Sequence, residues 1–163
     1  MKVNGGSEER TIKKTLRVTG TGAITANVLQ VTGTVRVLNQ FATITDVTTL
    51  VNATAVYSTA YDGTNSIDLT ADGAVLSGCP VNTFFTKDKD SSEIYTISKA
   101  DQVRKTEVSA EAEISLPFTV TQPFGIDTFI RLHLTTTDNP VDFTVALEFK
   151  YIPLSPDGNL VFL

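Results

Sequence analysis

Apolar and polar residues alternate strictly in several segments of this chain. Between residues 141 and 151 every odd position is apolar and every even position is polar or small, the period of a strand with one buried face. Residues 105–116 alternate in the same way, with glutamates at 107, 111 and 113 on one face. A third pattern, with valines at 31, 35 and 37, lies within a long stretch from Val28 to about Val51 that predicts extended chain.

Turn signals separate these segments. Asp62-Gly63 predicts a hairpin between Ala53 and Leu76, because both residues tolerate positive φ. A repeated Leu-x-Val-Thr-Gly-Thr motif, at 16–21 and 29–34, predicts two strands that pair as a hairpin or lie side by side. The one predicted helical piece is residues 98–103. About eight strands with regular turns predict an all-β antiparallel sandwich, jelly-roll-like, over residues 16–163.

The two ends of that domain, together with an adjacent pair of phenylalanines, supply the candidate partner contacts. Residues 1–15 predict a flexible basic arm, which is either simply solvated or touches an acidic partner. The apolar C-terminal tail either adds a strand to its own domain or docks on a neighbouring subunit. In a strand, the two phenylalanines face opposite ways, so one is either an exposed interface anchor or covered by the following loop. The candidate contacts are Arg10, Lys13, Lys14, Arg17, Phe84, Phe85, Leu160, Val161, Phe162 and Leu163.

Composition narrows the function classes. The abundance of threonine and valine favours strands. A net charge of −5 argues against nucleic-acid binding. A single cysteine allows no intrachain disulfide, and neither a signal peptide nor a membrane-spanning apolar run is evident. We therefore expect a non-membrane protein that stays in, or is assembled in, the cytosol.

Candidate catalytic and metal-binding residues are few. His133 is the only histidine and Cys79 the only cysteine, so a triad, a thiol–histidine pair and a structural zinc site are all disfavoured. Glu107, Glu111 and Glu113 give only a loosely permissive spacing for glycosidase chemistry. The acidic loops lack the twelve-residue calcium-binding pattern. We expect no enzymatic activity, no cofactor and no bound metal.

Two parts of this Thr-, Val- and Gly-rich chain have a distinctive sequence. They are Val18-Thr19-Gly20-Thr21-Gly22-Ala23-Ile24-Thr25 with its echo Val31-Thr32-Gly33-Thr34, and the run from Tyr61 to Thr70. In these parts the chain resembles structural virion proteins of tailed bacteriophages. The resemblance implies a capsid decoration or auxiliary protein that binds and stabilises the phage head as a homo-oligomer, often a trimer. It also implies partners among major capsid or tail proteins, location in the virion, and binding by arms and strand addition.

Two other functions stay open at this point. One is a phage tail or fibre component. The other is a carbohydrate- or receptor-binding β-sandwich, for which the chain offers four tyrosines as stacking platforms. These are Tyr57, Tyr61, Tyr95 and Tyr151.

Overall fold

All regular elements in the described part of the chain are β-strands. The computed structural model describes residues 8–51, 53–69, 76–87, 94–98, 104–105, 117–137 and 140–163. The strands are β1 (Arg10–Gly20), β2 (Ala23–Thr32), β3 (Thr34–Thr49), β4 (Ala53–Tyr61), β5 (Ser66–Asp68), β6 (Thr83–Lys87), β7 (Ile94–Ser98), β8 (Arg104–Lys105), β9 (Phe118–Thr121), β10 (Thr128–Thr136), β11 (Val141–Pro153) and β12 (Asn159–Phe162). The predicted all-β class is confirmed.

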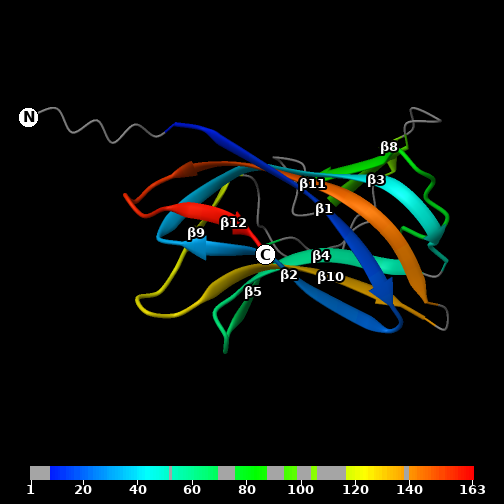
Figure 1. Ribbon diagram of the computed structural model, residues 1–163, viewed down its shortest axis with the longest axis horizontal. Helices are drawn as coiled ribbons and strands as arrows, with labels where there is room; N and C mark the ends of the chain where they lie inside the picture. The colour runs from blue at the N-terminus through cyan, green and yellow to red at the C-terminus, as the bar shows by residue number, and fades with distance from the viewer. Residues whose placement is uncertain are drawn as a thin grey trace, which may run out of the picture.

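The strands form two sheets that lie one above the other (Figure 1). The seven-stranded sheet A runs β1-β11-β3-β6-β7-β8, with β9 also paired to β3. The five-stranded sheet B runs β12-β2-β10-β4-β5. Every pairing is antiparallel, as expected. The strands outnumber the predicted eight, because short strands are added to both sheets.

The core fills the space between the sheets. Alternation along β11 buries the odd positions of residues 141–151, as the sequence predicts. The Tyr151 hydroxyl, a polar group in this core, donates to Asn159 Oδ1 at 2.5 Å. The largest fully buried side chains come from strands of both sheets, except Leu76, which lies between β5 and β6. They are Tyr151, Leu29, Ile44, Leu76, Ile130, Val31, Val35, Val37, Val141 and Val145.

Two predictions about neighbouring strands are wrong. The repeated motif does not form a hairpin, because β1 pairs with β11 in sheet A while β2 pairs with β10 and β12 in sheet B. The stretch from Val28 to Val51 is not one extended segment either. It breaks at Gly33, whose φ of 56° lies in the left-handed region, and the chain passes from sheet B to sheet A.

Other predicted elements fare differently. The hairpin at Asp62-Gly63 is confirmed, with Asp62 N–H donating to Asn65 O at 3.1 Å between β4 and β5. The helical piece 98–103 and the strand 105–116 lie outside the described residues, apart from their ends in β7 and β8. Within the described residues, no helix is long and apolar enough to cross a membrane.

The last six residues of the predicted basic arm and most of the apolar tail lie in sheets. Residues 10–15 are part of β1, because Ile12, Leu16 and Val18 supply a core-facing row that pairs along β11. The apolar tail adds a strand to its own domain as β12. Leu163 N–H extends this pairing by donating to Val28 O at 3.1 Å.

A candidate partner-binding hollow on the outer face of sheet A

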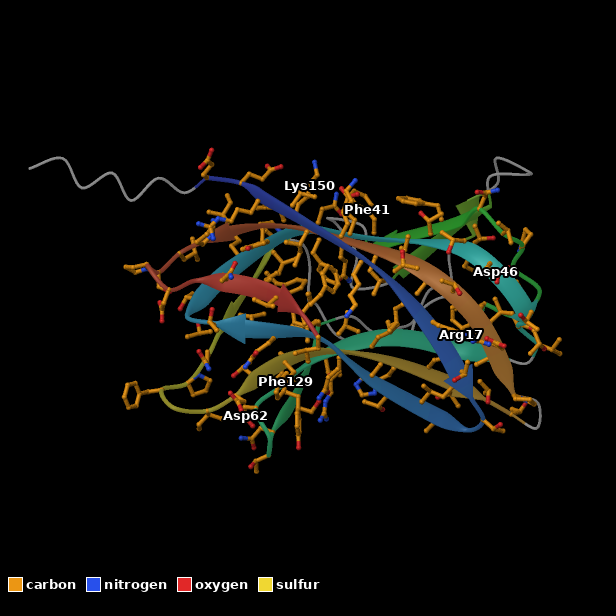
Figure 2. All side chains as sticks on the ribbon, in the orientation of Figure 1. Arg17, Phe41, Asp46, Asp62, Phe129 and Lys150 are labelled. Carbon is orange, nitrogen blue, oxygen red and sulfur yellow. The ribbon has the colours of Figure 1, made fainter. Side chains whose placement is uncertain are left out.

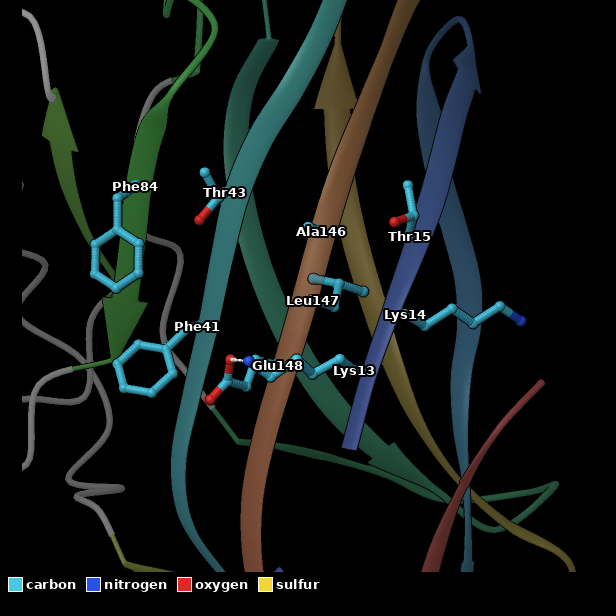
Figure 3. Close-up of a pocket in the computed structure, with 9 residues that line it drawn as sticks. All are labelled: Lys13, Lys14, Thr15, Phe41, Thr43, Phe84, Ala146, Leu147 and Glu148. Carbon is cyan, nitrogen blue, oxygen red and sulfur yellow. Dashed lines mark ion pairs between the residues drawn. The ribbon is translucent and has the colours of Figure 1, made fainter. Parts of the chain in front are cut away.

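Four adjacent strands of sheet A align their outward side chains in two rows. Residues directly opposite each other in an antiparallel pair share a face of the sheet. The first row runs Lys13, Glu148, Phe41 across β1, β11 and β3. The second row runs Thr15, Ala146, Thr43, Phe84 across β1, β11, β3 and β6. Distant parts of the sequence therefore meet on one surface (Figure 3).

Between these rows the sheet carries an open hollow of about 640 Å³. Its floor is low because the side chains of Thr15, Ala146 and Thr43 are short. One wall is the pair of rings Phe41 and Phe84, whose centroids are 5.4 Å apart with an angle of 32° between the planes. The volume lies within the range of about 300–1,000 Å³ that small ligand pockets occupy.

The opposite wall of the hollow is an ion pair. Lys13 Nζ lies 2.7 Å from Glu148 Oε2 (Figure 3). Arg17 binds Asp142 with two parallel contacts, Nε to Oδ1 at 2.9 Å and Nη2 to Oδ2 at 2.8 Å. Lys13, which belongs to the predicted arm, and Arg17, which lies further along β1 (Figure 2), thus tie β1 to β11. Lys13 and Arg17 therefore stabilise the pairing of β1 with β11 as well as placing positive charge on the surface.

The Arg17–Asp142 pair gives stability a dependence on pH. The Arg17 hydrogen bonds hold the pKa of Asp142 below its ordinary 3.8. A carboxyl whose pKa is lower in the folded state adds stability above its unfolded pKa and loses it as pH falls through the folded value. We expect Asp142→Asn to lower the urea midpoint near neutral pH, and the difference from wild type to shrink toward zero in acid below 3.8.

Urea denaturation of both proteins across this pH range checks that expectation. An Arg17→Gln variant is the matched control, because it removes the other partner and should show the same shrinking difference. A constant gap between Asp142→Asn and wild type at every pH would contradict the role of this pair.

Lys14 occupies a different position from Lys13. It pairs with the buried Leu147, so it lies on the core-facing side of β1, at the edge of sheet A. Figure 3 shows its side chain extending past that edge, away from the two phenylalanine rings. An inward-facing lysine on an edge strand discourages pairing with another strand. The edge of β1 is therefore poorly suited to the strand addition that the resemblance implies.

The remaining candidate contacts are spread over the surface and core. Arg10 is exposed at the start of β1, opposite Tyr151. Phe84 lies in the hollow, whereas the side chain of its neighbour Phe85 is outside the described part of the structure. In β12, Leu160 is buried in the core, and the Phe162 ring packs edge-on against Phe149 at 6.2 Å between centroids. Only Val161 and Leu163 of that tail are exposed, at 45% and 50%.

The only histidine and the only cysteine of the chain contact the strands and core around them. His133 lies between two threonine hydroxyls, with Nδ1 3.0 Å from Thr25 Oγ1 and Nε2 2.9 Å from Thr59 Oγ1. Cys79 is buried in the core. No cluster of three or more His, Cys, Asp or Glu side chains able to hold a metal occurs among the described residues.

Two of the four tyrosines considered for sugar stacking, Tyr151 and Tyr61, are buried or engaged in other contacts. Tyr151 is 1% exposed. Tyr61 carries the Arg131 guanidinium over its ring, 3.2 Å from the centroid, and donates its hydroxyl to Gly63 O at 2.6 Å. The side chains of Tyr57 and Tyr95 lie outside the description.

Six residues that line the hollow were not predicted from the sequence as contacts, namely Thr15, Phe41, Thr43, Ala146, Leu147 and Glu148. Glu148 occupies an outward position in a strand whose alternation is visible, so its face could be predicted. The buried positions of β3 change from odd at Val37 to even at Gln40, so alternation does not predict the outward position of Phe41. Which outward residues meet depends on the register between strands, and β11 and β3 shift register at three points.

The chain matches no protein-family model, no curated protein and no solved structure.

Proposed function

We propose that this chain is a structural virion protein of the capsid-decoration type, which binds and stabilises a phage head surface as an oligomer. The hollow carries this proposal. It joins Lys13 and Phe84, two residues selected from the sequence as partner contacts, on one outward surface. Aromatic side chains are enriched at protein interfaces, and an aromatic wall beside an ion pair suits a protein partner.

The strand order gives the proposal a second support. Four pairs nest inside one another along the chain: β1 with β11, β2 with β10, β3 with β6, and β4 with β5. Successive pairs fall alternately in sheet A and sheet B. This is the order of a long hairpin rolled into a jelly roll, which we propose as the topology. Jelly rolls are common in viral capsid proteins.

Jelly rolls also occur in lectins, so fold alone does not select the virion role. The tyrosine surroundings favour the protein-binding alternative over a sugar-binding one. Tyr151 is buried, and Arg131 covers one face of Tyr61.

Sedimentation of particles from cells that produce the chain tests the proposal. We expect the wild-type chain to co-sediment with particles in a density gradient. Thr15→Arg, which fills the hollow from an exposed position on β1, should reduce the bound fraction at least tenfold. Thr11→Arg is the matched control, with the same substitution on the same face of β1 outside the hollow. A wild-type chain that stays in the free fraction would refute the proposal.

A further inference from the structure

The connection between β9 and β10 carries the most exposed large apolar side chain among the described residues. Phe124 has a relative exposure of 104%, so no described part of its own chain covers it. Figure 1 shows this connection projecting from the end of the sandwich at which β11 turns into β12. A fully exposed phenylalanine is costly to leave in water unless it meets a partner.

The backbone around Phe124 is held in a defined turn. Ile126 N–H donates to Pro123 O at 3.1 Å, and Gly125 has a φ of 72°, the positive value that a type II turn needs at its third position. Phe124 is therefore presented at the tip of a tight turn. An anchor that is already ordered loses little conformational freedom on binding.

Gln122 fixes that turn to the body of the protein. Its backbone N–H donates to Gly33 O at 2.8 Å, and its side-chain Oε1 accepts from Gly33 N–H at 3.2 Å. Its Nε2 donates to Ile126 O at 3.0 Å, across the base of the turn. The knob, meaning residues Gln122–Asp127 with Phe124 at the tip, is thus braced against the β2–β3 connection.

We propose that the knob of one copy inserts Phe124 into the hollow of a second copy. This inference rests on the proposed function, since it names the occupant of the same surface. The Phe41 and Phe84 ring centroids are 5.4 Å apart, and a third ring can pack on them at the spacing of about 4.5–7 Å that aromatic pairs prefer. The short side chains of the floor leave room for that ring.

The contact joins two different surfaces, so it is heterologous. Each copy offers one knob and one hollow, and repetition of the contact yields a closed ring or an open chain of subunits. This differs from association through the edge of β1, which Lys14 obstructs. A variant without a knob and a variant without an open hollow should therefore still bind each other when they are mixed.

Sedimentation velocity of the purified full chain tests this arrangement. We expect wild type to form species larger than a monomer as concentration rises. Phe124→Ser, which lacks the knob, and Thr15→Arg, which lacks an open hollow, should each remain monomeric. An equimolar mixture of the two should form a dimer and nothing larger, because one intact knob and one intact hollow remain.

Matched variants and folding controls accompany this test. Val51→Ser removes another exposed apolar side chain, 50% exposed, and should assemble as wild type does. Thr11→Arg should also assemble. At a protein concentration low enough for wild type to be monomeric, all variants should keep the wild-type urea midpoint within error, since the changed side chains are exposed. A monomeric wild type, assembly by Phe124→Ser, or a monomeric mixture would overturn the inference.

The same variants separate this inference from the proposed function. If Phe124→Ser assembles normally while Thr15→Arg loses particle binding, the hollow holds another virion protein and only the inference falls. If the mixture dimerises but wild type never co-sediments with particles, the inference stands and the virion proposal falls.

Discussion

Replacing Ile44 by alanine is expected to lower the free energy of unfolding by about 2–5 kcal/mol. Ile44 lies in β3, a strand with neighbours on both sides in sheet A, and its side chain is fully buried. Its backbone O also accepts from Asn82 N–H at 2.8 Å, ahead of β6. Truncation would leave a cavity that the surrounding strands cannot close.

Urea denaturation of wild type and variant measures this loss. Ile44→Val is the matched control, since it removes one methylene and should cost about 0.5–1.5 kcal/mol. The adjacent Thr43 points the other way, into the hollow, so Thr43→Ala should leave stability close to wild type. Equal effects of Ile44→Ala and Thr43→Ala would contradict the assignment of the two faces of β3.

Replacing Gly158 by alanine is expected to destabilise the protein by about 3 kcal/mol, the upper end for an overpacked site. An added Cβ would lie against the backbone oxygen of Thr34, well inside contact distance, and 3.0 Å from Ser155 O. Thr34 O cannot easily move, because it accepts from Leu154 N–H at 2.8 Å and Ser155 N–H at 3.3 Å. The turn between β11 and β12 would have to open.

Opening that turn should release β12 from the sheet, and amide hydrogen exchange can measure this release separately from global stability. Amide hydrogens of residues 159–162 should exchange faster in Gly158→Ala than in wild type, since β12 is an edge strand and β2 is its one strand partner among the described residues. Gly63→Ala is the control, because its added Cβ meets no atom within 4 Å and only its φ of 89° opposes alanine. Wild-type exchange in β12 of Gly158→Ala would show that the close approach is tolerated.

The sequence predicts an element best where the residues of that element alone determine its structure. Alternation over residues 141–151 correctly predicts β11, because its odd side chains all enter the space between the sheets. The Asp62-Gly63 hairpin was predictable for a similar reason. Asp62 accepts hydrogen bonds from Thr64 N–H at 3.0 Å and Asn65 N–H at 2.6 Å, so the turn is stabilised by its own residues.

Pairing between distant strands was not predictable in this way. The valines at 31, 35 and 37 keep one parity through Gly33, which conceals the passage from sheet B to sheet A. The turn there depends on partners far along the chain: Gln122 binds Gly33, and Ser155 Oγ accepts from Thr34 N–H at 2.8 Å. A local pattern carries no record of such contacts.

For the candidate site, too, single residues could be predicted from the sequence but their meeting in space could not. Lys13 and Phe84 were selected as single residues, one for charge and one for its aromatic neighbour. Their meeting across β1, β11, β3 and β6 depends on three separate registers. The tail residue Leu160 was selected for its apolar character, which instead places it in the core.

We propose that this chain contacts its partners through the outer face of sheet A. Electron cryo-microscopy of particles from cells that produce the chain would show this contact. We predict that the chain occupies repeated positions on the particle, with the hollow between Phe84 and Lys13 covered by a neighbouring subunit. Particles that lack the chain, or that carry it with this face open to solvent, would contradict the claim.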